Sequence, residues 1–558
     1  MTTSPLLIVL KYELRCSETT ITPSPLRLKV GIIDGPDTLN SQIPCSRILA
    51  FPNNTDYGHY QLDDMFPYEV KHTASASSHA SPLQQFTHKS YSHMVQVTVV
   101  CFPPSLYQLS AFFRTLDACA WREFNMAAYL VCLTTDGGIP LFTRTKGNLP
   151  QLPFPVIGSL NGVCMFANNQ DVTLLNTVTD DAKVVWKVFN ERITLIIVAS
   201  DDNASDLHLN RLLDFVFNSM VLLLGIDELT SFRNVELLKR ELRCCYSLID
   251  SLLEGTELTG NITQAVDIIL CPDVSFLQEF LDAFATAVSS EFGCLLVMGK
   301  VAVATERWWE LTGMETVLLS LLVHSLPPWS SRDIPIYLPY GSPKIPHRLL
   351  TFQLIEGVEV CVICGPKPTL QDAETKFLDQ YWRLAIDTLK TSRRSHPRNL
   401  PGDMVLDSGI LGFVLVNTDE HKSLSSVHPS GVLTGVDQGS TSGSGMSTAK
   451  RKSILVSFYK SVVGTLFPVQ EPNTSEQDSS SGVYHQAMET YICASDHKCY
   501  AIRTATHELF LLFSNEVPTY ALGGKFGHTQ EMIDNTIKSV IRTNMFFFIV
   551  TKEFLVYI

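Results

Sequence analysis

The sequence lacks the features that would place it in a membrane, in a secreted disulfide scaffold or on nucleic acid. Its longest apolar run without a charge, 215–225, is about half of the ~20 residues that a membrane span requires. The N-terminal run 6–10 is too short for a secretory signal, and Lys11 and Glu13 follow it directly. A formal net charge of -14 argues against nucleic-acid binding by whole-domain electrostatics. We therefore expect a soluble protein of a reducing compartment, with most cysteines in the core.

Motifs of nucleotide or hydrolytic chemistry are also missing. The glycine-rich stretch Gly435–Gly445 lacks the GK[ST] ending of a phosphate-binding loop, and Gly523-Gly524-Lys525 does not follow a strand–loop–helix pattern. His347 lies near Ser342 in the sequence, but no GxSxG elbow surrounds that serine, and a proline-rich turn explains the same residues. We expect no active site, no cofactor and no metal in this chain.

Two cysteine pairs invite a metal or redox interpretation. Cys361 and Cys364 form a CxxC, but they lie in the alternating apolar run Val358–Ile363, and no second CxxC is present. Cys244 and Cys245 are neighbours within a predicted helix, where adjacent side chains point about 100° apart. For both pairs, core packing is the favoured interpretation.

What the sequence does contain is the composition of several packed domains. Hydrophobic residues make up 45% and charged residues 18% of 558 residues, which predicts three or four globular domains. The first 125 residues contain a single strand-like piece, Met94–Cys101, and are expected to be a poorly structured extension.

From Met126 onward, one order of elements occurs three times. It begins with a two-strand hairpin, at 128–135 and 138–143, around the turn Asp136-Gly137. A helix with one apolar face follows over Pro155–Asn168, then three strands, 171–176, 183–189 and 192–199. The long helix 206–224 and a further helix over 231–253 complete the unit.

The second and third copies repeat this β-β-α-β-β-β-α order. The second has a connecting helix 276–290, hairpin strands 294–298 and 301–305, a helix 308–324, strands near 334–338, 348–355 and 359–363, and a helix 370–390. The third has strands 410–416 and 423–427, a helix 450–466, strands near 489–494, 499–504 and 508–513, and a helix 530–541. A repeated topology is stronger evidence than any single element.

The fold class that follows is an α/β (α+β) sandwich of three tandem domains, each a five-stranded antiparallel sheet flanked by helices. We place the domains at 126–256, 257–395 and 396–541. The third carries flexible insertions at 423–447 and 471–482, which are rich in glycine, serine and threonine or similar polar residues, and an atypical tail covers 542–558.

A basic stripe runs along the helix that closes the first unit. Glu236 and Glu241 lie among its positive charges. The stripe consists of four cations, Arg233, Lys239, Arg240 and Arg243. Such a stripe is usually a solvated helix face. The functional alternative is contact with anionic phospholipids or with an acidic partner.

Four long strings give the chain a resemblance to a known family. PFPVIGSLNGVCMF at 153–166, LLLGIDELTSFRNVELLKRELRCCYSLIDSLL at 222–253, ATERWWEL at 304–311 and RDIPIYLPYGSPKIPHRLLTF at 332–352 resemble the Fuzzy family of planar cell polarity effectors. The likeness covers roughly residues 126–541. It implies three tandem longin-like domains related to those of heterodimeric Rab exchange factors.

The resemblance further implies partners and a cellular role. Expected partners are an Inturned-like longin protein, a WD-repeat planar cell polarity effector (Wdpcp-like) and a Rab-type small GTPase. The expected role is a subunit of a guanine-nucleotide exchange complex in cilium assembly, with effects on vesicle trafficking and Hedgehog signalling. The expected location is the cytoplasm, the cytoskeleton and the basal body of the cilium. A non-catalytic scaffold or membrane tether in the basal-body complex is the alternative.

By position in the longin fold, the helix Pro155–Asn168 is the expected surface for the partner or the GTPase. Its apolar positions Val156, Leu160 and Val163 should face the core. Its candidate interface residues are Ser159, Asn161, Met165 and Asn168.

Overall fold

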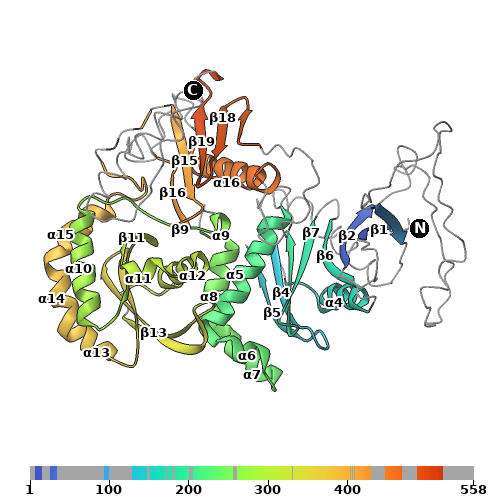
Figure 1. The fold of residues 1–558 in the computed structure, drawn as a ribbon, viewed down its shortest axis with the longest axis horizontal. Coiled ribbons are helices and arrows are strands. Elements are labelled where there is room, and N and C mark those ends of the chain that lie inside the picture. Colours follow the sequence, from blue (N-terminus) through green and yellow to red (C-terminus); the bar gives the residue numbers. More distant parts are fainter. Residues whose placement is uncertain are drawn as a thin grey trace, which may run out of the picture.

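The computed structural model describes three short N-terminal strands and most of residues 128–519. Gaps in the latter part fall at 147–150, 170–171, 179–181, 200–204, 255–259, 330, 403, 405, 408, 429–445 and 468–486. The described chain forms three β-sheets with helices between and around them (Figure 1). The insertion predicted at 471–482, the helix predicted at 530–541 and the tail 542–558 lie outside the described residues.

The first unit begins with a hairpin of β4 and β5 and continues through α4 and three further strands. Its elements are β4 (Ala128–Thr134), β5 (Pro140–Thr145), α4 (Phe154–Asn168), β6 (Val172–Val178), β7 (Lys183–Phe189), β8 (Ile193–Ala199), α5 (Asp206–Leu224), α6 (Ile226–Thr230), α7 (Val235–Glu241), a 3-10 turn (Leu242–Cys245) and α8 (Tyr246–Glu254). Val185 and Trp186 are consecutive residues of β7, so their side chains lie on opposite faces of the first sheet. Helix α4 covers the face with Trp186, and α5 covers the face with Val185.

The second unit repeats the arrangement after a short linker. The linker and connecting helix are α9 (Gly260–Thr263), β9 (Val266–Asp267) and α10 (Val274–Ala287). The unit itself comprises β10 (Phe292–Val297), β11 (Lys300–Ala304), α11 (Glu306–Trp309), α12 (Gly313–His324), β12 (Arg332–Leu338), β13 (Ser342–Ile355), β14 (Val358–Cys364), α13 (Leu370–Asp372), a π-helical turn (Ala373–Leu378), α14 (Asp379–Trp382), a 3-10 turn (Arg383–Ala385) and α15 (Ile386–Arg393).

The third unit has the same hairpin, helix and three strands within its described residues. They are β15 (Ile410–Asn417), β16 (Lys422–Ser426), α16 (Thr448–Thr465), β17 (Glu489–Cys493), β18 (His497–Arg503) and β19 (His507–Ser514). Residues 423–426, which the sequence placed at the start of a flexible insertion, belong to strand β16. The strand predicted over 423–427 is therefore confirmed at 423–426 by its pairing with β15, whereas the flexible insertion predicted over 423–447 does not begin at residue 423.

The strand order confirms the repeated topology. In all three sheets the second hairpin strand is followed by the first, then by the fifth, fourth and third strands of the unit: β5-β4-β8-β7-β6, β11-β10-β14-β13-β12 and β16-β15-β19-β18-β17. Every contact within these five-stranded units is antiparallel. The α/β fold of three tandem modules is therefore confirmed.

Additional strands extend two of the sheets beyond the expected five. Where the sequence predicted one strand within residues 1–125, three are described: β1 (Leu7–Leu14), β2 (Leu26–Ile33) and β3 (His93–Val99). They extend the first sheet through a parallel contact between β2 and β6. At the third sheet, β9 from the linker pairs in parallel with β16.

Three helices that the sequence predicts as continuous are broken. The helix predicted over 231–253 divides at the 3-10 turn Leu242–Cys245, and the one predicted over 308–324 divides between α11 and α12, where Thr312 begins α12 with a capping box. The helix predicted over 370–390 contains a π-helical and a 3-10 turn. The apolar period continues through such irregularities, so periodicity alone does not reveal them.

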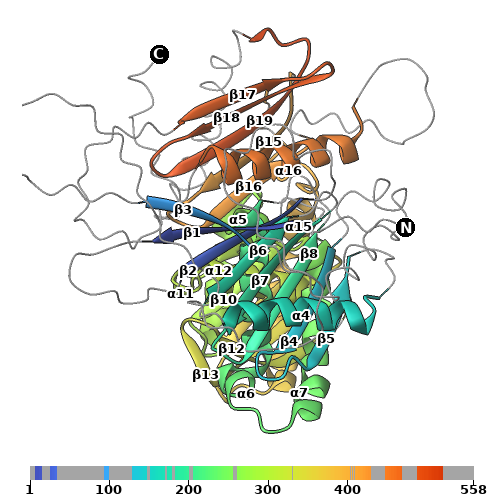
Figure 2. The same ribbon diagram turned by 90° about the vertical axis from the view of Figure 1, so that its right-hand side faces the viewer.

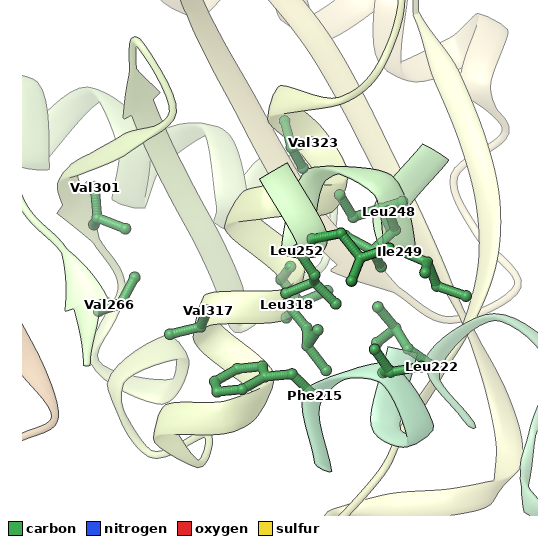
Figure 3. Packing of buried hydrophobic residues seen from close by; sticks show 14 of the residues in the cluster. Phe215, Leu222, Leu248, Ile249, Leu252, Val266, Val301, Val317, Leu318 and Val323 are labelled. Atoms are coloured by element: carbon green, nitrogen blue, oxygen red, sulfur yellow. The ribbon is translucent and has the colours of Figure 1, made fainter. Parts of the chain in front are cut away.

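One apolar core joins the three units around α5. A continuous cluster of buried side chains runs from the first sheet through α5, α8 and α12 to the third sheet. Figure 3 shows Phe215 and Leu222 of α5 beside Leu248, Ile249 and Leu252 of α8 and Leu318 of α12. Helix α5 is the one described helix long and apolar enough to cross a membrane, but most of it is buried inside this core.

Candidate partner-binding face on helix α4

Helix α4 is fixed to the first sheet by a well-defined inner side. Pro153 precedes the helix in extended conformation, and Pro155 occupies the first turn, where its missing N–H costs nothing. Val156, Leu160 and Cys164 are buried against the sheet. The indole Nε1 of Trp186 on β7 donates a hydrogen bond of 3.1 Å to the carbonyl oxygen of Leu160. The orientation of α4 is therefore set by both packing and a buried polar contact.

The outer side of α4 is an exposed apolar face, which we call the α4 face. It consists of Phe154, Gly158, Gly162, Met165 and Phe166, whose spacing of four, four, three and one residues places them on one side of the helix. Phe154 is 72% exposed and Phe166 54% exposed. A Cβ atom added at either glycine would meet no atom within 4 Å, so the backbone is open to a partner between the two aromatic ends.

Two features frame the α4 face. The β4–β5 turn lies against Asn161, because a Cβ atom at Gly138 would be 2.0 Å from the Asn161 Nδ2 atom. Ile139 beside that turn is another exposed apolar side chain. Figure 2 shows α4 crossing in front of the first sheet, on the side away from the second unit. The face is therefore on an accessible side of the molecule.

The equivalent helices of the other two units have no such face. Helix α12 is enclosed by α5, α8 and its own sheet, and its residues from Glu315 to Ser320 are all buried. Helix α16 is also contacted by α5, and its exposed positions are mostly polar or small, namely Ser447, Thr448, Ala449, Lys450, Ser453, Ser461 and Thr465 with Leu466 at its end. Among these three equivalent helices, α4 alone presents bulky apolar side chains along its outer side.

The candidate interface residues divide between the two sides of α4. Met165 and Asn168 are exposed, and Asn161 is half-buried with its Nδ2 3.2 Å from the Met165 sulfur. Ser159 is buried, and its hydroxyl donates to the Pro155 carbonyl oxygen at 2.9 Å. The prediction of Ser159 as an interface residue was therefore wrong. A small hydroxyl that is hydrogen-bonded to its own helix can lie on the buried side of that helix.

Three further positions depart from the sequence-based assignment. Val163, expected in the core, is half-buried, for which the surrounding contacts give no reason. Phe154 and Phe166 are the largest exposed side chains of α4 but were not among the candidates. Phe154 and Met165 are 11 residues apart, about three helical turns, so they lie on the same side of α4, and Phe166 adjoins Met165. That spacing is the signal that could have found them.

The basic stripe is exposed on α7 and the following 3-10 turn. Arg233, Arg240 and Arg243 are exposed, whereas Lys239 is half-buried and forms an ion pair of 2.8 Å with Glu236. Three of the four cations are therefore available to solvent. The stripe lies on α7, which Figure 1 shows projecting from the molecule together with α6.

The cysteine pairs show no arrangement for a metal. Cys361 and Cys364 are buried on opposite faces of the second sheet, and burial raises the pKa of Cys364 to about 11. Cys245 is buried in the shared core, whereas Cys244 is exposed, so the core interpretation holds for only one member of that pair. All ten cysteines among the described residues are free thiols, and these residues contain no group of metal-ligating side chains.

The His347 region is likewise structural. Arg348 donates to both carboxylate oxygens of Asp333 at 3.1 Å from its Nε atom, and its guanidinium also donates to the carbonyl oxygen of Pro368 at 2.8 Å. These contacts hold β12 and β13 to the loop that precedes α13. Ser342 donates its hydroxyl to the Ile345 carbonyl oxygen at 3.2 Å and is not bonded to His347.

The comparisons with known proteins define a class of longin proteins. Residues 128–252, 288–383 and 409–535 match the first, second and third longin domains of FUZ, MON1 and HPS1. Each of these ranges contains the five strands of one structural unit that the structure describes. The protein is therefore a three-longin-domain protein.

The relatives identify the family within that class. The chain is 48% identical over 405 residues to the Protein fuzzy homolog of Xenopus tropicalis, covering 71% of this chain and 96% of that protein. It is 41% identical over 414 residues to the Protein fuzzy homolog of Homo sapiens, covering 72% and 96%, and 41% identical over 415 residues to that of Rattus norvegicus, covering 73% and 97%. The chain belongs to the Fuzzy family.

Proposed function

We propose that this protein acts in cilium assembly as one subunit of a heterodimeric guanine-nucleotide exchange complex for a Rab-type small GTPase. Its partners in this proposal are an Inturned-like longin protein and a Wdpcp-like WD-repeat protein, and its site of action is the cytoplasm and cytoskeleton at the basal body. Vesicle trafficking and Hedgehog signalling would depend on the assembly. Membership of the Fuzzy family supports this proposal.

The α4 face is the observation that carries the proposal. An apolar surface of two phenylalanines and a methionine around open glycines is costly to leave in water, because each buried large apolar side chain contributes about 1.5–3 kcal/mol. Glycines allow a second backbone to approach closely, and aromatic side chains at the ends provide anchors. The surface therefore suits a second longin domain better than a small molecule.

An exchange factor requires no catalytic dyad of its own. It accelerates nucleotide release by binding the nucleotide-free GTPase more tightly than the loaded one, which shifts a conformational equilibrium. A surface formed by two longin domains together can supply that differential binding. In this proposal α4 contributes one half of the surface, and the partner contributes the other half.

The test uses the full chain purified with its Inturned-like partner. Phe154→Asp should weaken association with the partner or the GTPase by at least thirtyfold, because a buried aromatic anchor contributes about 2 kcal/mol or more. The matched control is Leu384→Asp, since Leu384 is 79% exposed and lies in the second unit. Equal binding by the Phe154→Asp variant and the wild type would exclude the α4 face.

Exchange itself is measured as release of labelled GDP from a panel of Rab proteins. Acceleration by the complex, lost in the Phe154→Asp variant, is the expected result. A complex that assembles normally but accelerates release from no Rab would support the alternative, a non-catalytic scaffold or membrane tether. An exchange factor and a non-catalytic scaffold can be distinguished in this way, because partner binding and GDP release are measured independently.

A second candidate function rests on the basic stripe. Arg233, Arg240 and Arg243 are exposed cations that could contact anionic phospholipids, each contributing about 1 kcal/mol near an anionic surface. Replacing all three with glutamate should abolish co-sedimentation with phosphatidylserine vesicles. Unchanged co-sedimentation would remove the lipid role and leave the stripe as a solvated helix face.

A further inference from the structure

The third unit has an unusual sheet edge at strand β17. In each unit the third strand lies at the edge of the five: β6, β12 and β17. Strand β2 pairs with β6, and helix α5 packs along β12. Within the described part of the chain, β17 pairs with β18 alone. Figure 2 shows β17 as the outermost strand of the third sheet.

The other edges of the three units are covered as well. Helices α7 and α8 contact β5, a bridge from Ile268 pairs with Val301 on β11, and β9 pairs with β16. The β9–β16 contact matters most here, because it shows that the third sheet accepts an added strand from a distant segment. An uncovered strand edge is a template for pairing, which proteins usually avoid.

The hydrogen bonds to β18 determine which groups of β17 point outward. The N–H of Arg503 donates to the Met488 carbonyl oxygen at 2.7 Å, and the N–H of Ala494 donates to the His497 carbonyl oxygen at 2.9 Å. In an antiparallel ladder such bonded pairs alternate along the strand, so the even-numbered residues face β18. The N–H and C=O groups of Glu489, Tyr491 and Cys493 therefore face away from the sheet.

Three large apolar side chains at this edge are exposed to solvent. Tyr491 is 60% and Ile492 48% exposed, and Met488 before them is 50% exposed. As consecutive residues, Tyr491 and Ile492 lie on opposite faces of the sheet. Edges that avoid pairing carry lysines, prolines or bulges, and β17 has none of these in its sequence ETYIC.

We propose that the outer edge of β17 binds an extended, basic segment of a partner protein by strand addition. The backbone groups of Glu489, Tyr491 and Cys493 would form the ladder, while Tyr491 and Ile492 would contact apolar side chains on the two faces of the added strand. The net charge of -14 and the carboxylate of Glu489 at the edge favour a basic segment and disfavour a second copy of this chain. This surface is independent of the α4 face.

The chain itself supplies a suitable probe. Residues 497–503 form the antiparallel ladder on the inner edge of β17, have an apolar run at 499–502 and carry Lys498 and Arg503. A fluorescein-labelled peptide of this sequence, with Cys499→Ser to prevent disulfide exchange, is titrated against the full chain in fluorescence anisotropy. A second peptide with N-methyl groups on alternate residues tests the dependence on backbone hydrogen bonds.

The protein variant that removes an outward backbone donor is Tyr491→Pro, and it is compared with Tyr491→Ala, which loses the same side chain but keeps that N–H and should bind the peptide more tightly than Tyr491→Pro does. Proline removes an N–H that points outward, so the ladder with β18 is kept and the strand remains compatible with an edge position. Affinity for the peptide should fall at least tenfold, with an unchanged thermal midpoint. The control Met488→Ser removes an exposed apolar side chain but no outward N–H, and it should change affinity by less than about threefold.

Strand addition is supported if the wild type binds the peptide and both Tyr491→Pro and N-methylation abolish binding. It is overturned if the peptide fails to bind at 1 mM, or if Tyr491→Pro binds as tightly as the wild type. It is also overturned if sedimentation without peptide shows a dimer that Tyr491→Pro dissociates, since a second copy would then occupy the edge.

Discussion

The carboxyl group of Glu359 should make the stability of the second unit fall as pH rises. Glu359 lies on β14, between Leu296 of β10 and Gln353 of β13. Burial raises the pKa of its carboxyl from 4.5 to about 7. Its Oε2 atom is enclosed and has no hydrogen-bond partner among the described residues. The folded protein therefore binds the proton more tightly than the unfolded chain does.

The sign and size of the effect follow from linkage. A carboxyl with a raised folded pKa destabilises the fold most when ionised, so the cost is absent below about pH 4.5, grows as pH rises through 7, and is complete above it. A difference of about 2.5 units corresponds to roughly 3.4 kcal/mol as an upper bound. Because Glu359 is only partly buried, we expect about 1–3 kcal/mol after solvent screening.

The perturbation is Glu359→Gln, which keeps the shape and removes the ionisation. Thermal unfolding is followed at pH 5, 6, 7 and 8 by tryptophan fluorescence, since Trp308, Trp309, Trp329 and Trp382 all lie in the second unit. The variant should lie close to the wild type at pH 5, where only a small part of the cost is present, and exceed its midpoint by about 2–8 °C at pH 8. Glu279→Gln, at an exposed position of α10, is the matched control and should be neutral throughout.

Two results would refute this reasoning. A midpoint difference that is the same at pH 5 and pH 8 would show that packing, not ionisation, separates glutamine from glutamate. No difference at pH 8 would show that the carboxylate is solvated in the folded protein.

Two glycines and a core leucine give further tests by thermal unfolding. Gly225 has a φ of +82°, and a Cβ atom there would lie 2.9 Å from the Tyr337 ring, so Gly225→Ala should destabilise by at least about 1–3 kcal/mol. Gly158→Ala on the open side of α4 should instead be neutral or stabilise by up to about 1 kcal/mol, and a loss of stability would show that the face is covered. Leu318→Ala, in the core shared by α5, α8 and α12, should cost about 2–5 kcal/mol; a loss below 1 kcal/mol would argue against one joint core.

The repeated topology was predictable because each unit is encoded locally. Alternating strands such as Lys183–Phe189, the hairpin turn at Asp136-Gly137 and the apolar period of Asp206–Leu224 each specify one element. The same order of elements in three successive stretches then fixes the fold class. The breaks within the longer helices escaped prediction because the apolar side of a helix continues through a 3-10 or π turn.

The candidate site was predictable as a helix but not as a surface. The pattern of residues 155–168 gives a helix with an inner and an outer side, and Met165 and Asn168 are indeed exposed. The burial of Ser159 depends on how α4 packs against the sheet, which the spacing of residues within the helix does not determine. The exposure of Phe154 and Phe166 likewise depends on what lies above the helix.

The sequence by itself determined the number of units, their order of elements and the membership of the Fuzzy family, because these follow from local patterning and from long shared strings. Only the tertiary structure decided which of three equivalent helices stays exposed and which sheet edge has no further partner among the described residues. Helix α5 and the linker strand β9 bring together segments distant in sequence, and they bury α12, contact α16 and cover β12 and β16. The α4 face and the β17 edge remain because these segments do not reach them.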